Sequence, residues 1–256
     1  MQIVRTDTPI SWGSGSDLLF VAAGILIAGT LAKLPMYVDF PISGYTDGDY
    51  YVRNVGFFVL PVLIGFFCWR KLLSLGQILV VVNAVLVSFA YINYLPGKGN
   101  HYGDTVTLAF MHAPLFLWFV LGMTYVRMDF QALTERLEFL RYSSDLIVLS
   151  VLILFAGLIL TWTTTALFLT INLNIFEFYY EHVVVYGLVG ASIVANYIIS
   201  LNPAIVRKIS PLIARIFSPL ILVTVIAYLS SAIYTGKDPY NDREFLLVFN
   251  WLLMLV

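Results

Sequence analysis

Residues 146–169 read LIVLSVLILFAGLILTWTTTALFL and contain no charged side chain. As an α-helix, a stretch of this length reaches about 36 Å at ~1.5 Å per residue. The hydrocarbon core of a bilayer is about 30 Å thick, so the stretch is long enough to cross it. A helix is also the form that satisfies its own backbone hydrogen bonds without water. The stretch therefore predicts a transmembrane helix.

The whole chain has the composition of a membrane protein. Of its 256 residues, 60% are hydrophobic and 11% are charged, whereas soluble domains average about 45–50% apolar and about 25% charged residues. A chain with so little charge lacks the polar surface of a water-soluble globule. The formal net charge is −1, so there is no basic surface of the kind that binds nucleic acid. The lipid bilayer is the expected surrounding.

Other apolar stretches divide the chain into further spans. We predict an all-α polytopic integral membrane bundle with about seven full spans and a truncated eighth, and we expect residues 1–256 to form a single membrane domain. The full spans are Asp17–Leu34, Val55–Trp69 with a start near Tyr50, Leu75–Ile92, Thr105–Val126 after an N-cap at Asp104, Leu146–Leu169, Val183–Leu201, and Pro211–Tyr234 after an N-cap at Ser210. The eighth, Phe245–Val256, reaches about 18 Å at ~1.5 Å per residue, too short to cross. We expect the native protein to continue beyond Val256, with a re-entrant end as the alternative.

The cations predict the orientation, because loops on the cytoplasmic side of a membrane carry an excess of Lys and Arg. With the N-terminus inside, nine cations lie inside and five lie outside. The inner set is Arg5, Arg70, Lys71, Arg127, Arg136, Arg141, Arg207, Lys208 and Arg215, and the outer set is Lys33, Arg53, Lys98, Lys237 and Arg243. The sequence therefore favours a cytoplasmic N-terminus.

Two segments between spans read as interfacial or cytoplasmic helices rather than loops. In Met128–Tyr142 the apolar side chains fall on one helical face and charged ones cover most of the rest, a pattern typical of helices that lie on a membrane surface. In Asn202–Ile216 the cations Arg207, Lys208 and Arg215 alternate with apolar residues. These three are candidate inner basic anchors that contact anionic lipid head groups. The alternative is that they only fix orientation.

The second half of the chain resembles a known family. The stretches that carry the resemblance are RLEFLRY at 136–142, ISPLIARIFSPL at 209–220 and KDPYNDREFLLVFN at 237–250. They resemble the bacterial domain-of-unknown-function 4153 family, whereas the first half is similar only in hydropathy. The resemblance implies a longer polytopic protein of the bacterial cytoplasmic membrane. It implies no established activity and supplies no site residues.

A few polar side chains lie inside predicted spans, where the hydrocarbon core makes an unpaired polar group unfavourable in free energy. His112 is about 12 Å into the fourth span at ~1.5 Å per residue, and Pro114 frees a backbone carbonyl beside it. Asn83, Asn196 and Asn250 lie inside apolar stretches of the third, sixth and eighth spans. Polar groups at such depth either line a wet cavity or path, or bond between helices and fix their packing. We treat the four as a candidate intramembrane polar site, with helix packing as the alternative.

A second candidate is an outer rim at the mouth of the sixth span. Glu177 and Glu181 share a helical face one turn apart, and His182 follows directly. Two carboxylates and an imidazole are able to bind a divalent cation, but their spacing matches no known zinc motif. A solvated rim is the alternative, and we assign no metal.

Three function classes remain open. The first is a transporter or permease-like module with an unknown small solute. The second is a non-catalytic membrane scaffold or sensor that acts through a protein partner. The third, less favoured, is a membrane-embedded enzyme that uses the outer rim. The sequence contains no nucleophile elbow, phosphate loop, dinucleotide fingerprint or kinase signature, so we assign no cofactor and no catalytic residue.

Overall fold

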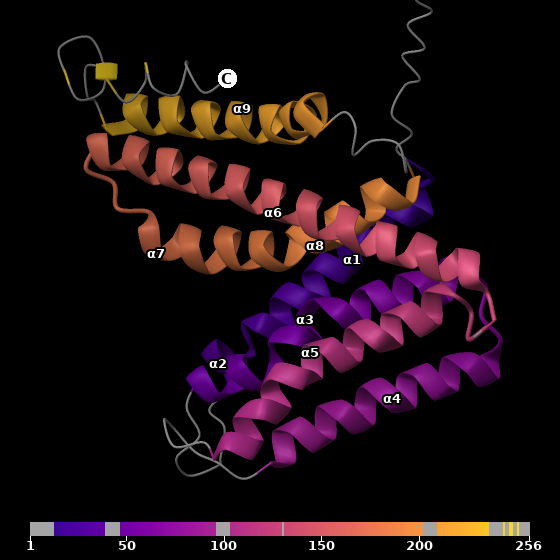
Figure 1. Cartoon of the computed structure of the whole chain (residues 1–256). Helices are drawn as coiled ribbons and strands as arrows, with labels where there is room; N and C mark the ends of the chain where they lie inside the picture. Colours follow the sequence, from indigo (N-terminus) through magenta and orange to yellow (C-terminus); the bar gives the residue numbers. More distant parts are fainter. Residues whose placement is uncertain are drawn as a thin grey trace, which may run out of the picture.

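The computed structural model describes residues 13–38, 47–95, 103–129, 131–201 and 209–235, and the single residues 243, 246, 247 and 250. Every regular element within these ranges is helical. In chain order the elements are α1 (Gly15–Ala32), α2 (Leu34–Tyr37), α3 (Asp47–Arg70), α4 (Leu75–Tyr94), α5 (Asp104–Tyr125), α6 (Leu133–Thr170), α7 (Phe176–Tyr179), a π-helical turn η1 (Tyr180–Val184), α8 (Val185–Leu201) and α9 (Ile209–Thr235) (Figure 1).

The predicted all-α polytopic bundle is confirmed. Six of the described helices are long and apolar enough to cross a membrane: α1, α3, α4, α5, α6 and the continuous run through α7, η1 and α8. A seventh apolar helix, Phe217–Ser231 within α9, is shorter. Among the described residues the number of full spans is therefore slightly lower than the predicted seven. The predicted eighth span, Phe245–Val256, lies almost wholly outside the described residues.

The starts of two helices follow directly from the sequence. Ser14 accepts a hydrogen bond from the backbone N–H of Asp17, whose carboxylate accepts one from the N–H of Ser14. Ser74 and Gln77 form the same reciprocal capping box at the start of α4. Such boxes satisfy backbone N–H groups that the first helical turn leaves without partners.

Both N-caps predicted from the sequence are wrong by position. The cap of α5 is Gly103, which has no side chain to offer, and Asp104 is the first residue of the helix. There its carboxylate still interacts favourably with the positive end of the helix dipole. In α9 the helix begins at Ile209, so Ser210 lies inside the first turn.

The segment Met128–Tyr142, predicted as an interfacial or cytoplasmic helix, is helical in its larger part but is not a separate helix. From Leu133 onward its residues belong to α6, which continues through the predicted fifth span as one helix of 38 residues. No glycine or proline occurs between Leu133 and Ala156, so nothing in that stretch breaks the helix. At ~1.5 Å per residue α6 is about 57 Å long, nearly twice the thickness of a bilayer core. Of the second predicted interfacial helix, residues 202–208 lie outside the described ranges and 209–216 form the first turns of α9.

The long helices follow one another across the molecule. Figure 1 shows α4 at one edge, then α5, α3, α1, α8 and α6, with α9 at the other edge. The closest pairs are α3 with α5, α6 with α8, and α1 with α8. The main core lies among these five helices and includes Leu63, Phe66, Leu121, Leu149 and Ile193. In contrast, α4 contacts its neighbours α3 and α5 along one side.

The contact between α1 and α8 depends on one glycine. A methyl group at Gly29 would overlap the ring of Tyr186 in α8. The ring therefore lies directly against the backbone of α1, and its hydroxyl comes within 3.5 Å of the Thr30 hydroxyl. Small residues are the usual means by which membrane helices approach each other closely.

We expect Gly29→Ala to lower the free energy of unfolding by about 1–3 kcal/mol, because overpacked contacts force neighbouring side chains or backbones to move. Gly187→Ala is the matched control, since a methyl group there meets no atom within 4 Å among the described residues. Its effect should be neutral or stabilising by up to about 1 kcal/mol. Unfolding in mixed detergent micelles measures both, and equal effects of the two substitutions would contradict the close α1–α8 contact.

Candidate functional site

The structure brings two of the four candidate intramembrane residues together. Asn83 of α4 and His112 of α5 line one open groove between these helices, and both side chains are exposed. Asn83 Nδ2 donates to the carbonyl of Leu79 at 2.9 Å, and His112 Nδ1 lies 2.7 Å from the carbonyl of Leu108. Each therefore bonds to its own helix rather than to a neighbouring one.

The other two asparagines lie elsewhere. Asn196 of α8 is 1% exposed, and its Oδ1 accepts a hydrogen bond of 2.7 Å from the hydroxyl of Tyr142 in α6. This is a buried contact between two helices, as in the packing interpretation. Asn250 is helical and exposed.

The outer rim of Glu177, Glu181 and His182 lies on α7 and η1. Glu177 and His182 are exposed and Glu181 is half-buried. The His182 ring stacks on Phe178 at a centroid distance of 4.7 Å, and its Nδ1 lies 3.1 Å from the Phe178 carbonyl. Within the described ranges no three His, Cys, Asp or Glu side chains gather in a way that would hold a metal ion.

Two of the basic anchors, Arg207 and Lys208, lie outside the described residues. The third, Arg215, lies in α9, and its side chain is likewise outside the description.

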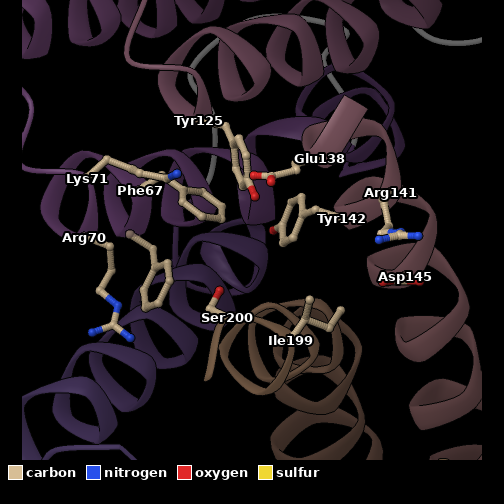
Figure 2. Close-up of a pocket in the computed structure, with 11 residues that line it drawn as sticks. Phe67, Arg70, Lys71, Tyr125, Glu138, Arg141, Tyr142, Asp145, Ile199 and Ser200 are labelled. Carbon is tan, nitrogen blue, oxygen red and sulfur yellow. The ribbon is translucent and has the colours of Figure 1, made fainter. Parts of the chain in front are cut away.

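A pocket with a different composition lies where α3 and α5 end, α6 begins and α8 ends. We call this end of the bundle the Arg70 end. The pocket has a volume of about 590 Å³, within the usual range for small-molecule sites. Its lining residues are Phe66, Phe67, Arg70, Lys71, Tyr125, Glu138, Arg141, Tyr142, Asp145, Ile199 and Ser200 (Figure 2).

Three aromatic rings form one wall of this pocket and hold its helices together. Phe67 meets Tyr125 and Tyr142 edge-on at centroid distances of 5.1 and 5.2 Å, and the two tyrosines stack at 5.4 Å. Each such pair contributes about 0.5–1.5 kcal/mol beyond the burial of its area. The triangle joins α3, α5 and α6, and the Tyr142–Asn196 bond adds α8. The walls are thus fixed before any ligand binds.

The charges on the two walls differ in sign. The α3 wall carries Arg70 and Lys71, and the α6 wall carries Glu138, Arg141 and Asp145, which lie three and four residues apart on one helical face. Figure 2 shows Arg70 and Lys71 on one side of the pocket and Arg141 and Asp145 on the other. The α3 wall is therefore doubly positive, whereas the α6 wall has a net charge of −1.

These charged groups are engaged to different degrees. Arg70 Nη1 lies 3.5 Å from Asp17 Oδ1, and Lys71 Nζ lies 4.4 Å above the ring of Tyr125. By contrast, Glu138, Arg141 and Asp145 make no side-chain hydrogen bond or ion pair with another residue of the described ranges. The α6 charges are available to a ligand.

Ser200 adds an unsatisfied polar atom to the pocket. Its Oγ is buried and has no hydrogen-bond partner in the described part of the chain. Leaving a buried hydroxyl without a partner costs about 1–3 kcal/mol, so such atoms in native structures call for an explanation. A ligand that bonds to Ser200 would remove this cost.

Sequence reasoning did not identify this pocket. It used Arg70, Lys71 and Arg141 as orientation signals and assigned Glu138 and Arg141 to a surface helix. The usable signal was that no helix breaker follows Tyr142. The helix therefore continues, and the face that carries Glu138 and Arg141 also carries Asp145. The opposing wall from α3 has no such signal, because the meeting of α3 and α6 is a tertiary contact.

Comparison with known proteins gives no relative: neither a protein-family model, nor a curated protein, nor a solved structure matches the chain. The chemistry of the pocket is thus the main guide to function.

We expect Tyr142→Phe to lower the free energy of unfolding by about 1–2 kcal/mol, because the buried Asn196 Oδ1 then loses its donor. Tyr94→Phe is the control, since Tyr94 is 92% exposed and its change should stay within about 0.5 kcal/mol. Combining Tyr142→Phe with Asn196→Val in a double-mutant cycle gives the coupling energy of the pair. A coupling energy of zero would show that the bond contributes nothing.

Proposed function

We propose that this multi-pass membrane protein binds a small zwitterionic solute in the pocket at the Arg70 end, as a transporter or permease-like module. The observation that carries the proposal is the arrangement of the pocket: a doubly positive wall faces a net negative one, and an unsatisfied hydroxyl lies between apolar surfaces. Arg70 also pairs with Asp17 and Lys71 lies over the Tyr125 ring, whereas the charges of the α6 wall have no ion-pair partner in the described ranges and are open to a ligand.

The charge pattern supports a ligand with both signs. An acidic group of the ligand, carboxylate or phosphate, bonds to Arg70 and Lys71, and guanidinium groups bind such oxygens with two parallel hydrogen bonds. An ammonium group of the ligand then faces Glu138 and Asp145. A singly charged ligand pairs with the charges of one wall only, and the charges of the other wall then have no partner in the ligand.

The pocket also favours a ligand with an apolar portion. Phe66, Phe67 and Ile199 are buried side chains that contribute apolar lining beneath the charged groups. Small-molecule sites usually combine such apolar surface with a few polar groups that fix orientation. α-Amino acids with apolar side chains have this combination of groups, whereas phosphoethanolamine has the two charged groups without the apolar portion.

The orientation and location are part of the proposal. The distribution of cations, nine against five, supports a cytoplasmic N-terminus, which puts the Arg70 end and its pocket on the cytoplasmic side. The resemblance of residues 136–142, 209–220 and 237–250 to the bacterial domain-of-unknown-function 4153 family supports a bacterial cytoplasmic membrane. A protein in this setting would bind its solute from, or release it to, the cytoplasm.

A second function is favoured by another observation. The groove between α4 and α5 exposes Asn83 and His112 on the flank of the bundle. Such a flank fits a membrane scaffold or sensor that acts through a protein partner. The two functions are compatible, since the pocket and the groove lie on different parts of the molecule.

The proposal is tested by binding measurements on the purified protein in lipid nanodiscs. We expect α-amino acids or phosphoethanolamine to raise the melting temperature, whereas acetate and methylammonium do not. Asp145→Asn should weaken binding about tenfold, because a charge-assisted hydrogen bond contributes about 1.5–3 kcal/mol. Ser200→Ala should weaken it by a smaller factor.

Glu177→Gln is the matched control, because it removes an exposed carboxylate on α7, outside the pocket. It should leave binding unchanged. Equal binding of the singly charged compounds, or equal loss in Glu177→Gln and Asp145→Asn, would overturn the assignment of the site. Uptake of the bound compound into proteoliposomes then separates transport from binding alone.

A further inference from the structure

The flank formed by α4 and α5 includes the least buried of the six long apolar helices, α4. Among the residues of α4, Val81 and Ile92 are buried, and the apolar side chains of Leu79, Val80 and Leu86 are exposed. Figure 1 shows α4 at the edge of the molecule, with α3 and α5 on one side of it and no labelled helix beyond it. Lipid alone would be an adequate cover for the apolar side chains.

Two polar side chains on this flank are poorly matched to lipid. Asn83 and His112 are both exposed, and each lies about 12 Å from the start of its own helix at ~1.5 Å per residue. This depth is near the middle of a span. Because Asn83 uses one N–H on its own helix, its second N–H and a lone pair remain for other partners; His112 keeps Nε2. Lipid chains offer no partner to these atoms.

The groove beside these side chains is lined partly by small residues. It has a volume of about 620 Å³, and Ala84, Ser88, Ala109 and Ala113 are among the residues that line it. Small residues at a helix surface let a second helix approach closely in the membrane. The flank therefore combines unmatched polar atoms with a surface that admits another helix.

We infer that a second copy of this chain covers the flank, with a two-fold axis along the membrane normal. Such an axis keeps every residue at its own depth, and where it passes beside Asn83 it brings this side chain against Asn83 of the second copy. A carboxamide is both donor and acceptor, which makes two of them self-complementary. The chain already uses this pairing inside the bundle, where Asn54 and Asn93 exchange hydrogen bonds of 3.0 and 2.8 Å.

This inference rests on the membrane setting of α4 and α5, not on the proposed solute. The pocket at the Arg70 end and the groove share no residue. If the tests below show no dimer while the solute still binds, the dimer inference fails. If the dimer forms but no solute binds, the proposed function fails.

The first test is the oligomeric state in phosphatidylethanolamine–phosphatidylglycerol liposomes, measured by single-molecule photobleaching over a range of protein-to-lipid ratios. We expect the wild type to form dimers and Asn83→Leu to weaken the dimer about tenfold, while Asn83→Gln keeps most of the association. Ser230→Leu is the matched control, because Ser230 is exposed on α9 and also bonds to its own helix. It should leave the dimer unchanged.

The second test locates the interface without altering Asn83. In a Cys68→Ser background, Val87→Cys places a thiol in the groove one turn from Asn83, and Val223→Cys places one on the exposed side of α9. We expect oxidation to cross-link Val87→Cys to a species of twice 28.8 kDa, and to leave Val223→Cys monomeric. Monomers at every protein-to-lipid ratio, or cross-linking through position 223 instead of 87, would overturn the inference.

Discussion

The position of α6 depends on a buried hydrogen bond between Tyr142 and Asn196. This bond fixes the first third of the longest helix to the end of α8, and the rings of Phe67 and Tyr125 hold the same tyrosine against α3 and α5. In a membrane, helices gain little from burying apolar surface against each other, because lipid is equally apolar. A directional contact of this kind therefore has a large effect on which helices meet. The pocket at the Arg70 end exists because α6 is held there.

The opposite end of the bundle shows how the chain satisfies polar atoms that it buries. Arg53 of α3 donates to the backbone carbonyls of Ile92 and Leu95 at 3.1 and 2.9 Å, where α4 ends and its last carbonyls lack helical partners. Its guanidinium also lies 5.2 Å from the centre of the Phe110 ring. Beside it, the Asn54–Asn93 pair closes the same contact between α3 and α4. Against this background, the exposed Asn83 and the Ser200 hydroxyl, which has no partner in the described part of the chain, are the groups to which the two proposals assign an outside partner.

The two proposals assign different partners to these places. A charged solute suits the pocket, because its charged side chains lie at the end of the bundle, where water is near. A second protein chain suits the groove, because its polar atoms lie at mid-depth, where neither water nor lipid offers hydrogen bonds. The depth of a polar group in the membrane thus decides which kind of partner it fits.

The class of the protein and the approximate limits of its spans follow from the amino-acid sequence. Uncharged stretches such as Leu146–Leu169 permit one regular structure in lipid, because the helix alone satisfies its own backbone. The sequence also identified Asn83, His112 and Asn196 as polar residues inside apolar spans, but it did not show what surrounds them. These helices are apolar on all sides, so periodicity does not tell which face meets another helix. Only the tertiary structure decided that Asn196 is internal, that Asn83 and His112 share a flank, and that the charges of α3 and α6 face each other. The physical reason is that membrane helices choose their neighbours by local shape and single hydrogen bonds, which leave no pattern along one chain.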